Sequence, residues 1–430
     1  MSKKINLYPF VLSLLLLCGI LNSCQDKCTE TRTYMKYSPV MKATEDVRNS
    51  FKLLPPQELQ NPGKIYTFQN SLFIVDRGIG FHIVDNSDPS SPIYTDFVQV
   101  DGCMDVAVRN NILYSNQGPD VISINISGEP GIISRSKNML NGGVEEDSII
   151  VAWNKSEVVE IIEGDCNGSS QNWDNGNRGF SNSADENISF NGNSSSSQSI
   201  NDSRTGNSSN GGSEGQSGSM SRFSIIGNNL YIVSDWDLLS YDIDAGMSLQ
   251  SRTRIGNGIE TVFGTDEYLY LGTTTGMIIY DRNQGGTPTF VSRLEHARGC
   301  DPVVVRGNFA FVTLRGNSSC GQAEDGLYVV NITDITNPTL HSMHPMISPY
   351  GLGVQNDVLM ICDGPAGLRV FDIKDLNAIS DSEIATDNSL NAYDVILNNG
   401  LAILSAEEGV FQYAFVCSGN LDRLSTLIGK

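Results

Sequence analysis

The stretch GFHIVDNSDPSSP, residues 80–92, contains the pattern that decides the fold. A glycine opens it, a short apolar run follows, an acidic residue ends the run, and prolines then break the chain. Similar phrases stand at GLYVVNITDITNP, residues 326–338, and at GLRVFDIKDLNA, residues 367–378. A short apolar run between turn residues is typical of a buried β-strand. Repetition of this phrase predicts a fold built from copies of one strand-containing unit.

Seven copies of the phrase can be aligned, most of them roughly 40 residues apart. Two apolar runs precede each copy, usually joined by Asn or Gly turns that suit tight hairpins, and a more polar run usually follows. Four short strands in each unit make a β-propeller blade. We therefore predict an all-β protein, a β-propeller of about seven four-stranded blades. The copies start at Gly80, Asp120, Asp237, Gly276, Gly326, Gly367 and Gly409.

The long interval between the second and third copies leaves eight blades as an alternative. Its apolar runs at residues 147–153 and 156–164 suggest an extra hairpin. The composition then changes to Asn, Ser and Gly, which offer little to bury. We expect a disordered insertion over about residues 165–220, inside a propeller that spans residues 61–430.

Residues 24–60 are interpreted as a linker or clasp, within which residues 41–54 could form a short helix. LDRLSTLI, residues 421–428, resembles the outer strand of the last blade. The two ends of the propeller would then share no blade. We therefore expect residues 34–54 to pack across the join between the first and last blades.

The N-terminal sequence predicts an export signal. Two lysines precede an apolar stretch, residues 7–21, that is too short to span a bilayer. LNSC, residues 21–24, resembles a bacterial lipobox. This resemblance implies that residues 1–23 are a lipoprotein signal peptide and that Cys24 becomes lipidated. The predicted location is the bacterial cell envelope, with a lipid anchor in the outer membrane, on either the periplasmic or the surface face.

The repeated phrases resemble the LVIVD repeat family of β-propellers, which are found in bacterial surface and periplasmic proteins. The segments GMIIYD, residues 276–281, and CDPVVVRGNFAFVTLRG, residues 300–316, are similar to it too. The resemblance covers roughly residues 60–428. It implies a propeller architecture and brings no established activity with it.

The charge of the chain narrows the choice of partners. Its formal net charge is −21, and an acidic surface repels phosphate backbones and anionic lipid headgroups. We therefore expect no nucleic acid partner, and membrane contact only through the lipid anchor. A protein or glycan partner at the cell envelope remains possible.

Function in propellers usually concentrates at one mouth of the central channel. The repeat register places nine candidate binding residues where innermost strands begin and second strands end. Such an acidic ring with two arginines and an aromatic residue could bind a cation, a sugar or a basic peptide. Alternatively, the carboxylates satisfy backbone N–H groups at the strand ends. The nine residues are Asp76, Arg77, Asp105, Glu260, Asp301, Arg315, Tyr350, Asp363 and Asp394.

The motifs of known chemistries are missing from the sequence. It contains four histidines and no zinc, haem-attachment or nucleotide-binding pattern. We therefore predict no cofactor and no metal ligand set, and leave catalytic residues unassigned. The favoured function is a binding or scaffold module with an unknown ligand. The alternative is a hydrolase or lyase that uses mouth carboxylates and a divalent metal.

Export also favours disulfide bonds. Cys300 begins an innermost strand, and the hairpin that follows returns the chain to the same mouth just before Cys320. We predict a disulfide between these two cysteines. Cys103 and Cys362 register to the same mouth but on different blades, and are expected to remain thiols.

Overall fold

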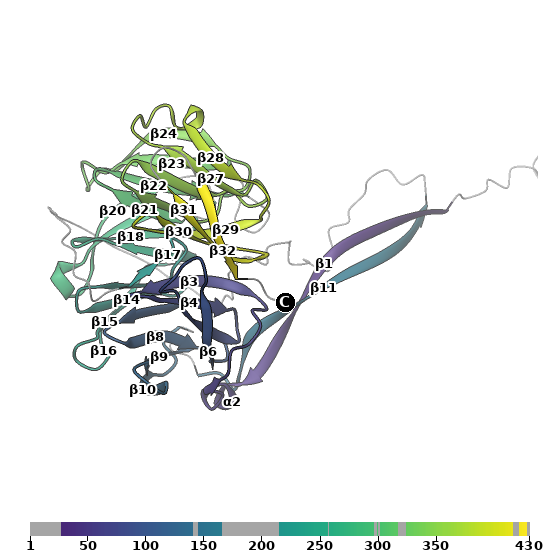
Figure 1. Cartoon of the computed structure of the whole chain (residues 1–430), viewed down its shortest axis with the longest axis vertical. Helices are drawn as coiled ribbons and strands as arrows, with labels where there is room; N and C mark the ends of the chain where they lie inside the picture. The colour runs from purple at the N-terminus through teal and green to yellow at the C-terminus, as the bar shows by residue number, and fades with distance from the viewer. Residues whose placement is uncertain are drawn as a thin grey trace, which may run out of the picture. The chain divides into compact units, whose positions relative to one another are not determined.

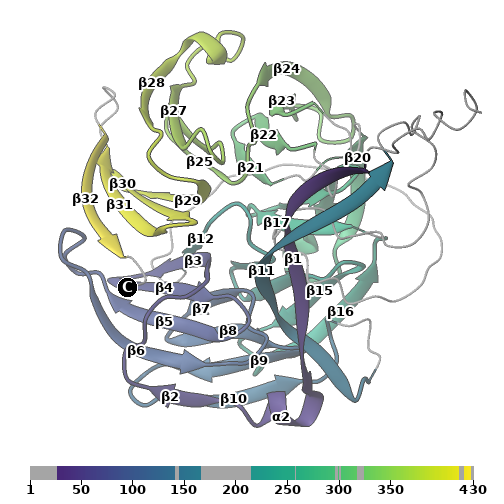
Figure 2. The same ribbon diagram turned by 90° about the vertical axis from the view of Figure 1, so that its right-hand side faces the viewer.

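The computed structural model describes residues 27–140, 145–165, 215–256, 258–295, 299, 302–316, 324–415 and 421–427. The chain divides into two units, Met1–Ser38 with Asn154–Ser181, and Pro39–Trp153 with Asn182–Lys430. Within its described residues the second unit contains seven antiparallel sheets. The sheets surround a common centre (Figure 1, Figure 2). This arrangement is a seven-bladed β-propeller and confirms the predicted fold class.

In each blade the strands follow one another outward from the centre in chain order. Blade 1 comprises β3 (Pro62–Phe68), β4 (Ser71–Asp76), β5 (Gly80–Asp85) and β6 (Ile93–Gln99), and blade 2 comprises β7 (Val106–Arg109), β8 (Ile112–Gln117), β9 (Asp120–Asn125) and β10 (Gly131–Ser136). Blade 3 comprises β13 (Phe223–Ile226), β14 (Asn229–Val233), β15 (Asp237–Asp242) and β16 (Ser248–Arg254), and blade 4 comprises β17 (Ile259–Gly264), β18 (Tyr268–Thr273), β19 (Gly276–Asp281) and β20 (Thr289–Glu295).

Blade 5 comprises β21 (Val303–Arg306), β22 (Phe309–Leu314), β23 (Gly326–Asn331) and β24 (Thr339–Pro345). Blade 6 comprises β25 (Leu352–Gln355), β26 (Val358–Cys362), β27 (Leu368–Asp372) and β28 (Glu383–Asp387), and blade 7 comprises β29 (Ala392–Asn398), β30 (Leu401–Ala406), β31 (Gly409–Phe415) and β32 (Leu421–Leu427). Two short 3₁₀ helices, Asn283–Gly285 and Ile379–Asp381, lie in connections before outer strands. The predicted strand runs and the outer strand of the last blade are confirmed.

The acidic residue that ends the apolar run of the repeated phrase stabilises the turn that follows. Asp85 ends β5, and its carboxylate accepts hydrogen bonds from the backbone N–H and the hydroxyl of Ser87, at 3.0 and 2.6 Å. Asp372 ends β27 in the same way and accepts from the N–H of Lys374 at 3.0 Å. Aspartate stabilises such turns by bonding its own backbone two residues on. The phrase therefore encodes a buried strand and the turn that leaves it.

Asparagine or glycine with positive φ stands in most of the hairpins between first and second strands. Asn110 and Asn111 join β7 to β8 with φ values of 51° and 60°. Two consecutive positive φ values suit the tight turns whose twist matches antiparallel strands. The predicted Asn and Gly turns are thus confirmed in the residues that the structure describes.

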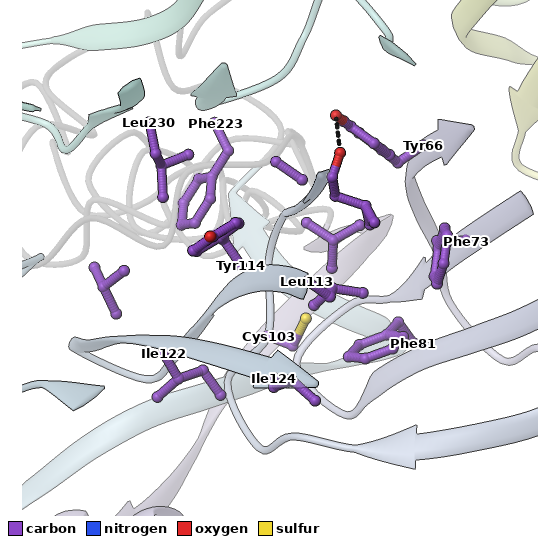
Figure 3. Close-up of a cluster of buried hydrophobic side chains, with 14 of the residues drawn as sticks. Tyr66, Phe73, Phe81, Cys103, Leu113, Tyr114, Ile122, Ile124, Phe223 and Leu230 are labelled. Atoms are coloured by element: carbon purple, nitrogen blue, oxygen red, sulfur yellow. Dashed lines mark hydrogen bonds between the residues drawn. The ribbon is translucent and has the colours of Figure 1, made fainter. Parts of the chain in front are cut away.

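Apolar side chains fill every interface between neighbouring blades. Figure 3 shows part of the largest cluster, which includes Phe73 and Phe81 of blade 1 and Leu113 and Ile122 of blade 2. The hydroxyl of Tyr66 donates to the carbonyl of Val108 at 3.2 Å across the same interface. Since both faces of a blade are covered, its inner strands are apolar throughout instead of alternating.

The interface between blade 7 and blade 1, here called the seam, closes the ring. Ile74 of β4 and Ile403 of β30 belong to one buried cluster there. Asn86 and Gln412 exchange two side-chain hydrogen bonds across it, at 2.9 and 2.7 Å. The strands of blade 7 all come from the C-terminal end of the chain, so the seam has no shared blade, as the sequence predicted.

The segment expected to cover the seam lies elsewhere. The helix α2 (Thr44–Arg48) confirms the short helix, but its Arg48 binds Asp120 of blade 2. The strand β2 (Lys52–Leu54) extends blade 1 by pairing with β6. The expected packing of residues 34–54 across the seam is therefore wrong for residues 39–54, which contact blades 1 and 2.

The extra hairpin predicted in the insertion is also wrong. Residues 148–165 form one continuous strand, β11 (Ser148–Asp165), which pairs with β1 (Lys27–Ala43) in a two-stranded sheet. An uninterrupted strand replaces the hairpin because its hydrogen-bonding partner comes from the distant N-terminal segment. In the described part of the chain, the seven blades and this sheet account for all sheets, so no eighth blade is seen there.

Candidate functional site

The channel has two mouths, which the strand directions distinguish. The entry mouth is the end at which the innermost strands β3, β7, β13, β17, β21, β25 and β29 begin and the second strands end. The exit mouth is the opposite end. Neighbouring innermost strands contact one another around the channel. Of the nine candidate residues, eight lie at strand ends that face the entry mouth, and Asp301 lies outside the described residues.

Two of the candidate aspartates hold the chain that enters their own blade. Asp76 accepts hydrogen bonds from the backbone N–H groups of Gln60 and Asn61, at 3.0 and 2.9 Å. Asp363 accepts from the N–H groups of Ile347 and Ser348, at 3.0 and 2.8 Å. Both carboxylates are buried. Their contacts match the structural alternative, in which strand-end carboxylates satisfy backbone donors.

Two further aspartates bind a segment that runs through the channel. Asp394 accepts from the backbone N–H of Ser219 at 3.2 Å and from its hydroxyl at 3.2 Å. Asp105 accepts from the hydroxyl of Ser221 at 2.8 Å and from the N–H of Arg222 at 2.6 Å. Burial raises the pKa of Asp105 above its ordinary value, although these hydrogen bonds and the nearby Lys64 act in the opposite direction.

Residues 215–221, here called the channel segment, come from the end of the Asn/Ser/Gly-rich insertion. The strand β12 (Gln216–Ser217) pairs antiparallel with the inner edge of β3. The N–H of Gly215 donates to the carbonyl of Val108 near the exit mouth, at 3.2 Å. Ser219 and Met220 reach Asp394 near the entry mouth. The expectation of disorder is therefore wrong for residues 215–220, and residues 166–214 lie outside the described part of the chain.

Four side chains form a contiguous row at the entry mouth, here called the Tyr350 ladder: Arg315, Tyr350, Tyr393 and Glu407. The guanidinium of Arg315 lies 3.6 Å from the centre of the Tyr350 ring. The rings of Tyr350 and Tyr393 pack edge to face, with centroids 5.2 Å apart. The Tyr393 hydroxyl donates to Glu407 at 3.3 Å. Both tyrosines are half-buried and Glu407 is exposed.

The backbone fixes the ladder in place across three blades. The hydroxyl of Thr313 donates to the carbonyl of Tyr350 at 2.5 Å. The N–H of Gly351 donates to the carbonyl of Tyr393 at 2.7 Å. These bonds link blades 5, 6 and 7 at the positions of the two rings. Aromatic faces flanked by a guanidinium and a carboxylate can stack on a sugar or hold a peptide.

The ladder contains two of the nine candidates, Arg315 and Tyr350. Glu407 is a second-strand end that the repeat register also places at this mouth, outside the nine, and Tyr393 is the residue that sequence reasoning missed. Tyr393 stands next to the chosen Asp394, at a register shift of β29 between Ala392 and Asp394 that regular strand alternation does not predict. A search for polar strand ends selected the aspartate, which is buried, over the half-exposed tyrosine. Arg77 and Glu260, the remaining candidates, belong to blades 1 and 4 and are half-buried.

The cysteines divide into described and undescribed positions. Cys103 and Cys362 are buried free thiols, in line with the expectation, and burial raises the pKa of both. Cys24, Cys300 and Cys320 lie outside the described residues. Across the described ranges, no three His, Cys, Asp or Glu side chains are grouped as metal ligands would be.

The sheet topology defines the class of protein, a seven-bladed β-propeller. Two stretches, residues 67–99 and 297–343, match the family model of the LVIVD repeat. The chain thus carries LVIVD repeats, and the resemblance to this repeat family is confirmed. The comparison with curated proteins found no match.

Solved structures with a similar arrangement share little sequence with this chain. The designed protein Ika8 is 11% identical, covers 87% of this chain and 92% of its own, and has a TM-score of 0.49. BamB from Moraxella catarrhalis is 8% identical over 87% and 96% of the two chains, with a TM-score of 0.47. Sqt1 from Saccharomyces cerevisiae is 9% identical over 88% and 87%, with a TM-score of 0.47.

Helices long and apolar enough to cross a membrane are absent from the described residues.

Proposed function

We propose that this protein is a non-catalytic binding module of the bacterial cell envelope, held there by a lipid on Cys24. The Tyr350 ladder would bind its protein or glycan partner. The observation that carries the proposal is the stack of Arg315, Tyr350 and Tyr393, in which Arg315 is buried and both tyrosines remain partly open to solvent at the entry mouth.

The other polar groups of the mouth support this choice by elimination. Asp76 and Asp363 are buried and accept from backbone donors, and Asp105 and Asp394 are buried and accept from Ser221 and Ser219 of the channel segment. A ligand would have to break these bonds to reach the four carboxylates. The two tyrosine rings and the Glu407 carboxylate of the ladder keep exposed surface, so a ligand can contact them from the solvent side.

Replacing Tyr350 or Tyr393 with alanine is expected to weaken partner binding about thirtyfold, because aromatic anchors at binding sites often contribute about 2 kcal/mol. The measurement is capture of partners from solubilised cell envelopes and from an immobilised glycan panel, followed by titration of the captured species. Leu340→Ala is the matched control, since Leu340 is 52% exposed on the outer strand of blade 5.

Equal capture by all variants would place the binding site elsewhere. Turnover of an envelope substrate that a chelator abolishes would instead favour the metal-assisted hydrolase or lyase.

Cys24→Ala is expected to move the protein from the membrane fraction to the soluble fraction. Diacylglycerol contributes two acyl chains, and two chains suffice for stable anchoring. The checks are fractionation and mass spectrometry of the N-terminal peptide, with Cys28→Ala as the control. If Cys24→Ala still fractionates with membranes as a lipidated species, the lipobox interpretation is wrong.

A further inference from the structure

The channel segment is bound in the manner of a peptide ligand. Its residues Gln216 and Ser217 add a strand to the edge of β3, which is a recurring mode of peptide recognition. Lys64 of blade 1 donates to the carbonyl of Met220. The side-chain amide of Gln216 donates to the carbonyl of Leu397 in blade 7, at 3.0 Å. Main-chain groups of the segment thus supply much of the contact.

The hydroxyl of Ser219 forms hydrogen bonds with groups on two different blades. Its hydroxyl donates to Asp394 of blade 7 at 3.2 Å and accepts from the N–H of Leu352 in blade 6 at 2.8 Å. Ser219, Met220 and Ser221 are buried. A longer side chain at position 219 would lose this two-sided bridge, so the channel selects a small hydroxyl residue there.

Two glycines show that the channel also selects by size. A Cβ atom on Gly218 would overlap the carboxylate of Asp394, and one on Gly215 would overlap the ring of Tyr66. Neither glycine has a positive φ. Their requirement is therefore space beside the channel wall, not backbone freedom, and it defines a pattern of Gly-x-x-Gly-Ser.

Chain connectivity does not force the segment into the channel. Ile149 and Val151 of β11 pack beside the turn glycines Gly78 and Gly118 at the entry mouth, whereas Gly215 lies near the exit mouth. Between the end of β11 at Asp165 and Gly215 the sequence has 49 residues, 166–214, a length that can reach many positions around the propeller. The position of the segment therefore follows from its own contacts.

We infer that the central channel is a peptide-binding site for an extended segment of the pattern Gly-x-x-Gly-Ser, and that residues 215–221 of this same chain are its resident ligand. The site uses other side chains than the Tyr350 ladder, although Asp394 and Leu352 lie close to Tyr393 and Tyr350 in the chain. It accepts a matching peptide in trans when the resident segment is displaced.

Gly218→Val tests this inference, because its side chain cannot fit beside Asp394 and should displace the segment. A labelled peptide of residues 215–222 should then bind Gly218→Val at least tenfold more tightly than it binds the wild-type protein, whose channel is filled. A peptide with valine in place of Gly218 should not bind. Gly131→Val is the matched control, since a Cβ atom there meets nothing within 4 Å and the φ is not positive.

Absent binding to folded Gly218→Val, or equal binding to all three proteins, would overturn the inference. If Gly218→Val does not fold, wild-type protein cleaved once within residues 166–214 provides the measurement. Slow amide hydrogen exchange of residues 217–220 should persist after cleavage, because the contacts of the segment itself hold it in the channel. Loss of that protection on cleavage would overturn the inference as well.

Discussion

Asp120→Ala is expected to lower the free energy of unfolding by about 3–5 kcal/mol, the range for a buried ion pair that loses one partner. The Asp120 side chain has no exposed surface and accepts from Arg48 at 3.0 Å and from Arg135 at 2.8 Å. It also accepts from the N–H of Asn138 at 2.9 Å. Alanine would leave two guanidinium groups, largely removed from water, without their shared carboxylate.

Urea denaturation at pH 7 measures this effect, and Asp244→Ala is the matched control. Asp244 also pairs with an arginine, Arg109, at 3.2 Å, but its side chain is 54% exposed. Exposed pairs contribute at most about 1 kcal/mol. Equal losses in both variants would show that α2 is not anchored through Asp120.

The same carboxylate should make stability depend on pH. Burial raises the pKa of Asp120, but the hydrogen bonds from Arg48, Asn138 and Arg135 outweigh it and hold the pKa below its ordinary 3.8. A lowered pKa in the folded state stabilises the fold above about pH 4, and this stabilisation is lost as the pH falls through the lowered pKa. Below about pH 4 the wild-type protein should therefore lose stability more steeply than Asp120→Ala.

Ile74→Ala and Ile403→Ala are each expected to lower the free energy of unfolding by about 2–5 kcal/mol, because each leaves a cavity in a closely packed interface. The two side chains lie on opposite sides of the seam in one buried cluster, at 0% and 1% exposure. Denaturation of both single variants and the double variant measures the effect. Since they share this cluster, the double variant should lose less than the sum.

Ile133→Ala is the control for both substitutions, since Ile133 is 58% exposed on β10. Surface substitutions of this kind change stability by about 0.5 kcal/mol or less. A seam variant that behaves like Ile133→Ala would contradict closure of the ring by apolar packing.

Local patterning predicted the blades because each strand run is short, apolar and bounded by turn residues. Pairing between distant segments leaves no such local trace. Arg48 and Asp120 stand 72 positions apart, and no periodicity connects them. For the same reason the local pattern of residues 147–164 predicts a hairpin, although β11 pairs with β1, which begins at Lys27.

Composition predicts disorder for the channel segment, and this prediction is wrong for a different reason. Gly, Ser and Asn offer few apolar groups, and such segments usually cannot offset the entropy of ordering. In the channel the backbone donors of Ser219 and Met220 instead meet the buried carboxylate of Asp394. Small residues are an advantage there, because the main chain can approach the wall.

The path of the channel segment has a consequence for the order in which the molecule assembles. The segment touches Lys64 of blade 1 and Asp394 of blade 7, so it joins both sides of the seam from within. Contacts across the seam span up to 342 positions, between Gly63 and Ser405. Such distant contacts carry the largest loop-closure entropy and form slowly. Blades 1 and 2 precede the segment in the chain, and five blades follow it. During synthesis the segment can therefore pair with blade 1 first, and the later blades can then fold around it.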